Sequence, residues 1–115
     1  MKKRVLLSMV FISGMTQFLK AQLVYKDVAA IFYARCTSCH HTNASDFPFM
    51  NYAQTAFKSS DIQFQLSINR MPPWSADTNY TRFQHERLIT SVEKQKILTW
   101  ISDGSLPGDK IGRAH

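Results

Sequence analysis

The five-residue stretch CTSCH, residues 36 to 40, constrains this 115-residue chain more than any other feature. It contains both cysteines of the chain, with two residues between them, and a histidine directly after the second. A disulfide between Cys36 and Cys39 would close too small a loop to stabilise a fold strongly. Because so short a chain buries a modest share of its surface, we expect a covalent or metal-bound group to complete its core.

This spacing suits a flat ligand attached at one edge. Near the end of a helix, residues three and four apart share a face, so Cys36 and Cys39 can meet one edge of the ligand while His40 points at its centre. C-x-x-C-H is accordingly a signature of covalent c-type haem attachment. Each thiol would add to a haem vinyl group as a thioether, and His40 would bind the iron through a neutral imidazole nitrogen. We favour this interpretation.

A redox disulfide and a zinc site are the alternatives. A thioredoxin-like cysteine pair needs a strand-helix-strand context, and the sequence has no alternating strand pattern of useful length. Zinc would need four ligands, Cys36 and Cys39 with His41 and His85, and the two histidines lack a recognised spacing. We expect His41 to be a solvent-facing loop residue.

The first 21 residues have the layout of a secretory signal peptide. Three basic residues at positions 2 to 4 precede an apolar stretch that ends near residue 19, and Ala21 follows. The apolar stretch is shorter than the roughly 20 residues that span a membrane. We therefore expect cleavage after Ala21, a mature chain of residues 22 to 115 that is periplasmic or extracellular, and no stable membrane insertion after cleavage.

Cleavage also changes the charge of the chain. The full sequence has 14 Lys and Arg against 8 Asp and Glu, a net charge of +6. The first 21 residues contain four of these basic residues and no acidic one, so the mature chain carries only about +2. No basic stripe with interleaved aromatic residues remains, which excludes nucleic acid as a partner.

Helical signals dominate the mature chain, so the expected fold class is all-α. Asp27 is the expected N-cap of a first helix that ends near the CTSCH motif, with Ala30, Ile31 and Ala34 on one face. The last helix has a capping box at residues 90 to 93. Its apolar positions follow at three- and four-residue spacing, and a glycine is its natural C-cap; these residues are Ile97, Trp100, Ile101 and Gly104.

Between these helices we expect loops and two short helices. A polar loop over residues 41 to 51 precedes the short helices, the first capped by Asn51 and the second by Ser59 or Ser60. Residues 71 to 89 are predicted to form a loop. Pro72 and Pro73 lack amide donors and favour extended geometry in the residues before them.

A haem iron bound by His40 would have a sixth position, for which Met71 is the predicted ligand. Met50 lies eleven residues after Cys39, too close to reach the opposite haem face. Met71 lies 31 residues after His40, and the prolines behind it stiffen the segment that would present its sulfur. A methionine there raises the reduction potential and suits electron transfer, whereas an open position permits gas binding or peroxidase chemistry. His85 is the chief rival ligand.

Several motifs together resemble small bacterial class I c-type cytochrome domains. They are CTSCH, a Pro-Phe pair eight residues beyond the histidine, RMPPW, and a last helix ending WISDGSLPGD, and they extend over about residues 26 to 109. Domains with Met-Pro-Pro-Trp also occur beside copper-dependent, ascorbate-type monooxygenase modules. The resemblance implies a small helical cytochrome c domain over residues 22 to 115, built around one covalently attached haem c with its iron.

The same resemblance implies a role for each matching residue. Cys36 and Cys39 would form the thioether bonds, His40 would be the proximal iron ligand and Met71 the distal one. Pro48 would offer its carbonyl to the other nitrogen of His40, which fixes the ring and raises its basicity.

The resemblance further implies that the first and last helices cross, with Phe32 and Trp100 in contact. One departure concerns the glycine often found soon after the haem histidine in this group. HTNAS, residues 41 to 45, stands in its place, so we expect the loop to Pro48 to take its own course.

The expected function is one-electron transfer between redox proteins outside the cytoplasm, which needs no catalytic residue and makes the protein a carrier rather than an enzyme. Arg70, Trp74 and Tyr80 flank the expected distal loop and are candidate donors to haem propionates. The alternatives are a haem enzyme or ligand sensor with an open sixth position, or a zinc or disulfide module.

Overall fold

A computed structural model describes most of the chain after the N-terminal segment. The described residues are 20–74, 77, 79–84 and 86–108. The predicted signal peptide, residues 1 to 21, lies outside them except for its last two positions, and so does His85. No helix within the described ranges is both long and apolar enough to cross a membrane.

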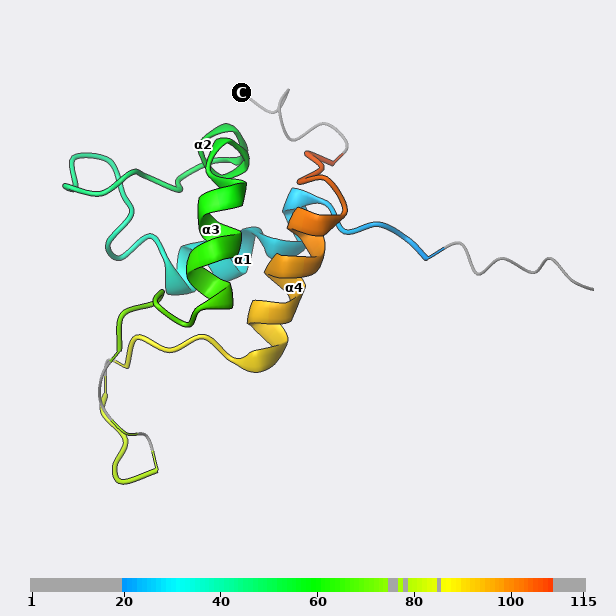
Figure 1. The fold of residues 1–115 in the computed structure, drawn as a ribbon. Helices are drawn as coiled ribbons and strands as arrows, with labels where there is room; N and C mark the ends of the chain where they lie inside the picture. Colours follow the sequence, from blue (N-terminus) through cyan, green and yellow to red (C-terminus); the bar gives the residue numbers. More distant parts are fainter. Residues whose placement is uncertain (1–19, 75–76, 78, 85, 109–115) are drawn as a thin grey trace, which may run out of the picture.

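The described chain is helical, which confirms the all-α prediction (Figure 1). The one β-type pairing among these residues is an isolated bridge between Val24 and Leu106. The residues described between 71 and 89 form no helix, as the two prolines predicted. The helices are α1 (Tyr25–Arg35), α2 (Tyr52–Phe57), α3 (Ser59–Ser67) and α4 (Ser91–Ser102).

The start of α1 differs from the prediction. Its N-cap is Val24, and Asp27 lies inside the first turn. The Asp27 carboxylate accepts a hydrogen bond from the Val24 amide at 2.9 Å. A carboxylate stabilises a helix from within the first turn because it satisfies an amide there and faces the positive end of the helix dipole. Asp27 therefore does stabilise the start of α1, but its assignment as the N-cap was wrong.

The buried face of α1 also differs from the prediction. Tyr25, Val28 and Phe32 are buried, whereas Ala30 and Ala34 are exposed. Large side chains remove more apolar surface from water than alanine does, so the helix turns them toward the core. The predicted alanine-containing face was wrong for that reason.

The two short helices follow each other without a loop. Asn51 caps α2 as predicted, since its Oδ1 accepts a hydrogen bond from the Gln54 amide at 3.0 Å. α3 begins at Ser59, and its N-cap is Lys58, which is also the C-cap of α2. The prediction of a serine cap for α3 was wrong, because only Lys58 stands between the end of α2 and the start of α3.

The capping box predicted for α4 is confirmed, whereas its C-cap is Asp103 and the predicted C-cap, Gly104, is the next residue. Thr90 Oγ1 accepts a hydrogen bond from the Glu93 amide at 3.1 Å, and the Glu93 carboxylate accepts one from the Thr90 amide at 2.9 Å. Gly104 follows the C-cap with φ at +105°, a conformation that glycine adopts without steric cost. Ile97 and Trp100 are fully buried, as the helical spacing indicated.

The core lies where α4 packs against α1 and α3 (Figure 1). The rings of Phe32 and Trp100 meet edge to face with centroids 5.9 Å apart, which confirms the expected contact between the first and last helices. The Trp100 indole donates to the Leu106 carbonyl at 3.0 Å, and the Tyr25 amide donates to the same carbonyl at 2.9 Å. This core supports the end of α1, where the CTSCH turn begins.

Candidate functional site

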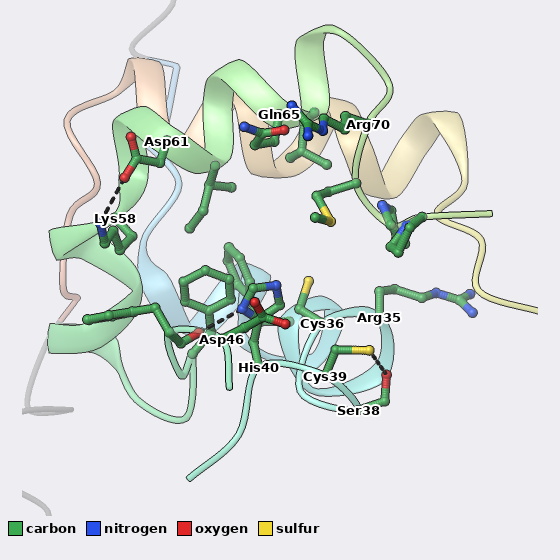
Figure 2. A pocket seen from close by; sticks show the side chains of 18 of the residues that line it. Arg35, Cys36, Ser38, Cys39, His40, Asp46, Lys58, Asp61, Gln65 and Arg70 are labelled. Carbon is green, nitrogen blue, oxygen red and sulfur yellow. Dashed lines mark hydrogen bonds and ion pairs between the residues drawn. The ribbon is translucent and has the colours of Figure 1, made fainter. Parts of the chain in front are cut away.

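A cavity of about 580 Å³ lies beside the CTSCH turn (Figure 2). This volume falls in the range of roughly 300 to 1,000 Å³ that small-molecule and cofactor sites occupy. All four predicted site residues line the cavity, namely Cys36, Cys39, His40 and Met71. The fold therefore brings Met71 to the same space as the motif.

Two walls face each other across this cavity. The CTSCH turn forms one wall, and α3 with the residues after it forms the other (Figure 2). Apolar side chains from three helices and one loop also line the space: Phe32, Phe49, Ile62, Leu66 and Ile97. Figure 2 shows Cys36, Cys39 and His40 on the first wall and Asp61, Gln65 and Arg70 on the second.

The turn after α1 keeps the motif compact. The Cys36 amide donates to the Phe32 carbonyl at 2.9 Å, which carries the helical pattern past the last residue of α1. The His40 amide donates to the Cys36 carbonyl at 2.9 Å, and the Cys39 amide donates to the same carbonyl at 3.2 Å. These helix-like bonds place the two thiols and the imidazole along one wall.

The His40 ring is oriented by a backbone carbonyl. Its Nδ1 lies 2.7 Å from the Phe47 carbonyl oxygen. A carbonyl only accepts, so Nδ1 carries a proton, and in the neutral imidazole Nε2 is then the nitrogen with the lone pair. Such an arrangement is typical of metal-binding histidines, in which one nitrogen donates to the protein and the other is left for the metal.

The carbonyl that bonds His40 is one residue earlier than the resemblance implied. The expected partner was Pro48, and that assignment was wrong. The Phe49 amide donates to the His40 backbone carbonyl at 3.0 Å, which fixes the loop with the Phe47 carbonyl facing the ring. The Phe49 ring also stacks on the imidazole, with centroids 4.4 Å apart and planes 23° apart.

Asn43 turns the loop that follows the motif. It has φ at +68°, and the Ala44 amide donates to the His41 carbonyl at 3.1 Å to close the turn. Asparagine tolerates this left-handed conformation better than other residues with side chains, apart from glycine itself. A left-handed residue is thus present within the HTNAS segment, which stands in place of the family's glycine.

The surroundings of Cys36 favour the protonated thiol. Burial is the largest of the causes that raise the pKa of this thiol to about 12, and the nearby Cys39 and Glu93 act in the same direction. Reactive redox cysteines have pKa values well below the ordinary one. A thiol with a raised pKa stays protonated at neutral pH, which disfavours the disulfide-exchange alternative.

His41, another of the zinc candidates, does not line the cavity. His41 is exposed, as predicted, and its Nδ1 contacts the carbonyl of neighbouring Thr42 at 2.9 Å. In the part of the chain that the structure describes, no three His, Cys, Asp or Glu side chains gather as a metal-binding group. His85, the other candidate, lies outside that part.

Arginines supply positive charge at the cavity. Arg70, a predicted propionate donor, lines it, and so does Arg87, which the sequence interpretation missed. The other two predicted donors do not line the cavity: Trp74 packs against Phe83 with ring centroids 5.9 Å apart, and Tyr80 is 90% exposed. Nothing in the local sequence distinguishes Arg87 from the neighbouring charged residues.

Gln65 is a second cavity residue that the sequence interpretation missed. Its side-chain oxygen is buried without a hydrogen-bond partner. Ile62 and Leu66, three residues before it and one residue after it on α3, line the same cavity. Helical spacing from Ile62 would have placed Gln65 on this face.

Two thiols, one imidazole and one thioether line this cavity. Apolar side chains and arginines form the rest of its lining. This set fits a flat, mostly apolar ligand that carries a metal at its centre and anionic groups at its edge. The chain matches no protein-family model, no curated protein and no solved structure.

Proposed function

We propose that this protein is an exported electron carrier of the small c-type cytochrome kind, with one haem c attached through Cys36 and Cys39. The observation that carries this proposal is the common wall formed by these two thiols and His40. On that wall the imidazole is held through Nδ1 by the Phe47 carbonyl at 2.7 Å, so that Nε2 is left to bind a metal.

Both cysteines are free, as covalent attachment requires. A thioether forms when a thiol adds across a vinyl double bond, the sulfur to one carbon and the hydrogen to the other. Cys36 is in the wall of the cavity, where it would meet one vinyl group. Cys39 lines the same cavity, with the Ser38 hydroxyl 3.9 Å from its sulfur.

Met71 would supply the second axial ligand. It follows α3 and lines the cavity that His40 lines from the turn after α1, and these two segments form opposite walls. The haem iron, when bound, would alternate between ferrous and ferric states and so carry one electron. A thioether ligand favours the ferrous state and raises the reduction potential.

Two arginines would bind the acidic edge of the cofactor. Arg70 and Arg87 line the cavity, and charge-assisted hydrogen bonds from arginine to carboxylates are strong and often bidentate. The apolar residues at the cavity exclude water from the cofactor. Redox proteins of the same compartment would donate and accept the electron.

The full chain with its own N-terminus tests the proposal when it is expressed in a bacterial host that matures c-type cytochromes. The expected product begins at Gln22, carries the mass of one haem, and gives the pyridine haemochrome spectrum of a haem with both vinyl groups saturated. The variant Cys36→Ser with Cys39→Ser should lose the covalent haem. Ser38→Ala, in the same turn, should retain it.

Two results would overturn the proposal. One is a colourless product with the mass of the bare chain, from a host that matures another c-type cytochrome in parallel. The second is ready binding of carbon monoxide by the reduced protein at neutral pH, which would indicate an open iron position and hence an enzyme or a ligand sensor.

A further inference from the structure

We infer that Asn79 is an attachment site for an oligosaccharide, which is transferred to its side-chain nitrogen after export. The second substrate of this transfer belongs to the class of oligosaccharides carried on a lipid diphosphate. The inference rests on the export of the chain, which is one part of the proposed function, and it does not depend on the haem.

The first observation is the sequence around Asn79. Asn79, Tyr80 and Thr81 match the pattern Asn-x-Ser/Thr, which marks an acceptor of asparagine-linked glycans on a surface loop of an exported protein. Asp77 stands two positions before the asparagine. Bacterial transferases of this class recognise an acidic residue at that place, so the segment contains the longer acceptor pattern as well as the short one.

The second observation is the exposure of this segment. Residues 79–84, drawn in yellow-green, lie on the loop between α3 and α4, which extends away from the packed helices (Figure 1). Asn79 and Thr81 are exposed, and the Tyr80 side chain between them is 90% exposed. A transferase has to enclose the acceptor segment in its own site, which a folded chain permits only at such a loop. None of these residues lines the cavity, so a glycan here leaves the cavity open.

A turn centred on Asp77 presents the acceptor. Its Oδ1 accepts a hydrogen bond from the Asn79 amide at 2.8 Å, and its backbone carbonyl accepts one from the Tyr80 amide at 3.2 Å. The first of these bonds is typical of an Asx turn. Both use backbone amides. Within the part of the chain that the structure describes, no hydrogen bond engages the Asn79 side-chain amide or the Thr81 hydroxyl. These are the two groups that a transferase has to reach.

The transfer itself exchanges one bond for another. The side-chain nitrogen of Asn79 forms a bond to the anomeric carbon of the first sugar. The bond between that carbon and the diphosphate oxygen breaks, and the lipid diphosphate leaves with the electron pair. One proton of the amide passes to a base of the transferase. The Thr81 hydroxyl, both donor and acceptor, is the group by which the transferase holds the acceptor in register.

Asn43, Ala44 and Ser45 match the short pattern too, but two features distinguish this second match. His41, and not an acidic residue, stands two positions before Asn43. The backbone at Asn43 is left-handed, with φ at +68°, so it would have to change to fit an extended peptide-binding site. We therefore assign the modification to Asn79, and Asn43 is its matched control.

Expression of the full chain with a glycosylation system tests this inference. The host is a bacterium that matures c-type cytochromes and also carries an asparagine-linked oligosaccharyltransferase with its lipid-linked oligosaccharide. Intact mass should show one glycan besides the haem, and peptide mapping should locate it at Asn79. Asn79→Gln and Thr81→Ala should lose the glycan, whereas Thr81→Ser and Asn43→Gln should keep it. Asp77→Asn retains an oxygen for the turn but removes the charge, and it should also lose the glycan.

The outcomes separate this inference from the proposed function. A processed product with haem but without glycan would overturn the inference alone, provided that an established acceptor protein is glycosylated in the same cells. A glycan that persists in Asn79→Gln would overturn it as well. A glycan at Asn79 on a product without haem would support the inference and overturn the haem proposal. An unprocessed chain that stays in the cytoplasm would overturn both.

Discussion

Arg35 and Glu93 join the end of α1 to the start of α4. The Arg35 Nε lies 3.1 Å from Glu93 Oε2 and 3.3 Å from Oε1, and Arg35 Nη2 lies 3.1 Å from Oε1. Both side chains are half-buried. Because Arg35 directly precedes Cys36, the pair ties the CTSCH turn to the helix that also contributes Trp100 to the core.

This pair predicts how stability depends on pH. The hydrogen bond from Arg35 lowers the pKa of Glu93, and the capping contact with Thr90 lowers it further. A carboxyl whose pKa is lower in the folded than in the unfolded state stabilises the fold above its ordinary pKa, and this contribution is lost as the pH falls through the lowered value. We expect Glu93→Gln to reduce the free energy of unfolding by about 0.5 to 1 kcal/mol at pH 7. The difference from the wild type should vanish in acid.

Urea unfolding at pH 7 and at a series of lower pH values that starts at the ordinary pKa of glutamate, near 4.3, and continues into stronger acid checks this prediction. Gln keeps the capping box, so the variant isolates the charge. Arg82→Met is the comparison, because Arg82 is 70% exposed in its pair with Glu86 and should cost less than Arg35→Met. A stability difference for Glu93→Gln that stays constant with pH would contradict the assignment.

Met71→Ala should lower the reduction potential and give a high-spin ferric spectrum. If Met71 is the distal ligand of the proposed haem, the substitution removes the thioether that would favour ferrous iron and leaves no ligand of comparable strength at that position. Potentiometric titration and the visible spectrum measure both effects. Met50→Ala is the matched control, since Met50 does not line the cavity, and it should retain the wild-type spectrum. A low-spin, methionine-type spectrum in Met71→Ala would move the ligand elsewhere.

Asn69 should be replaceable by glycine at lower cost than by alanine. Its φ of +56° costs a residue with a Cβ about 1 kcal/mol or more, and glycine nothing. Both variants lose the contact with Lys94. We expect Asn69→Ala to destabilise the holoprotein by about 1 to 2 kcal/mol and Asn69→Gly by less, as measured by urea unfolding. Equal losses would mean that the side-chain contact alone matters.

Phe32→Ala should be the most destabilising of these changes. Phe32 is 1% exposed and contacts both Phe49 and Trp100, so its removal leaves a cavity in the core. A loss of about 3 to 5 kcal/mol is typical of such a substitution. Phe57→Ala serves as the control, because Phe57 is 77% exposed, and its thermal unfolding should stay close to that of the wild type.

The sequence predicted a helix end correctly where a single side chain caps the helix. Asn51 and Thr90 are caps as expected, because a cap depends on residues three positions away. Gly104 ends α4 for a similarly local reason. Asp27 and the α3 serines were misassigned, since the start of those helices depends on what packs or ends beside them.

The sequence also predicted some residues of the candidate site and missed others. CTSCH and Met71 were found from the sequence because thiol, imidazole and thioether groups are rare and their chemistry is specific. Arg87 and Gln65 were not found, because arginine and glutamine are common surface residues and only their position at the cavity distinguishes them. The carbonyl that holds His40 was assigned to Pro48 and belongs to Phe47, because the course of the loop after the motif decides which carbonyl faces the ring.

The amino-acid sequence alone determined which groups are present, the helical character of the chain and the CTSCH motif, since these depend on residues a few positions apart. Tertiary structure alone decided that α3 and its C-terminal turn face the motif across a cavity, and which polar groups line it. Contacts between residues far apart in the chain depend on how Phe32, Ile97 and Trp100 pack, and that packing is a property of the whole fold.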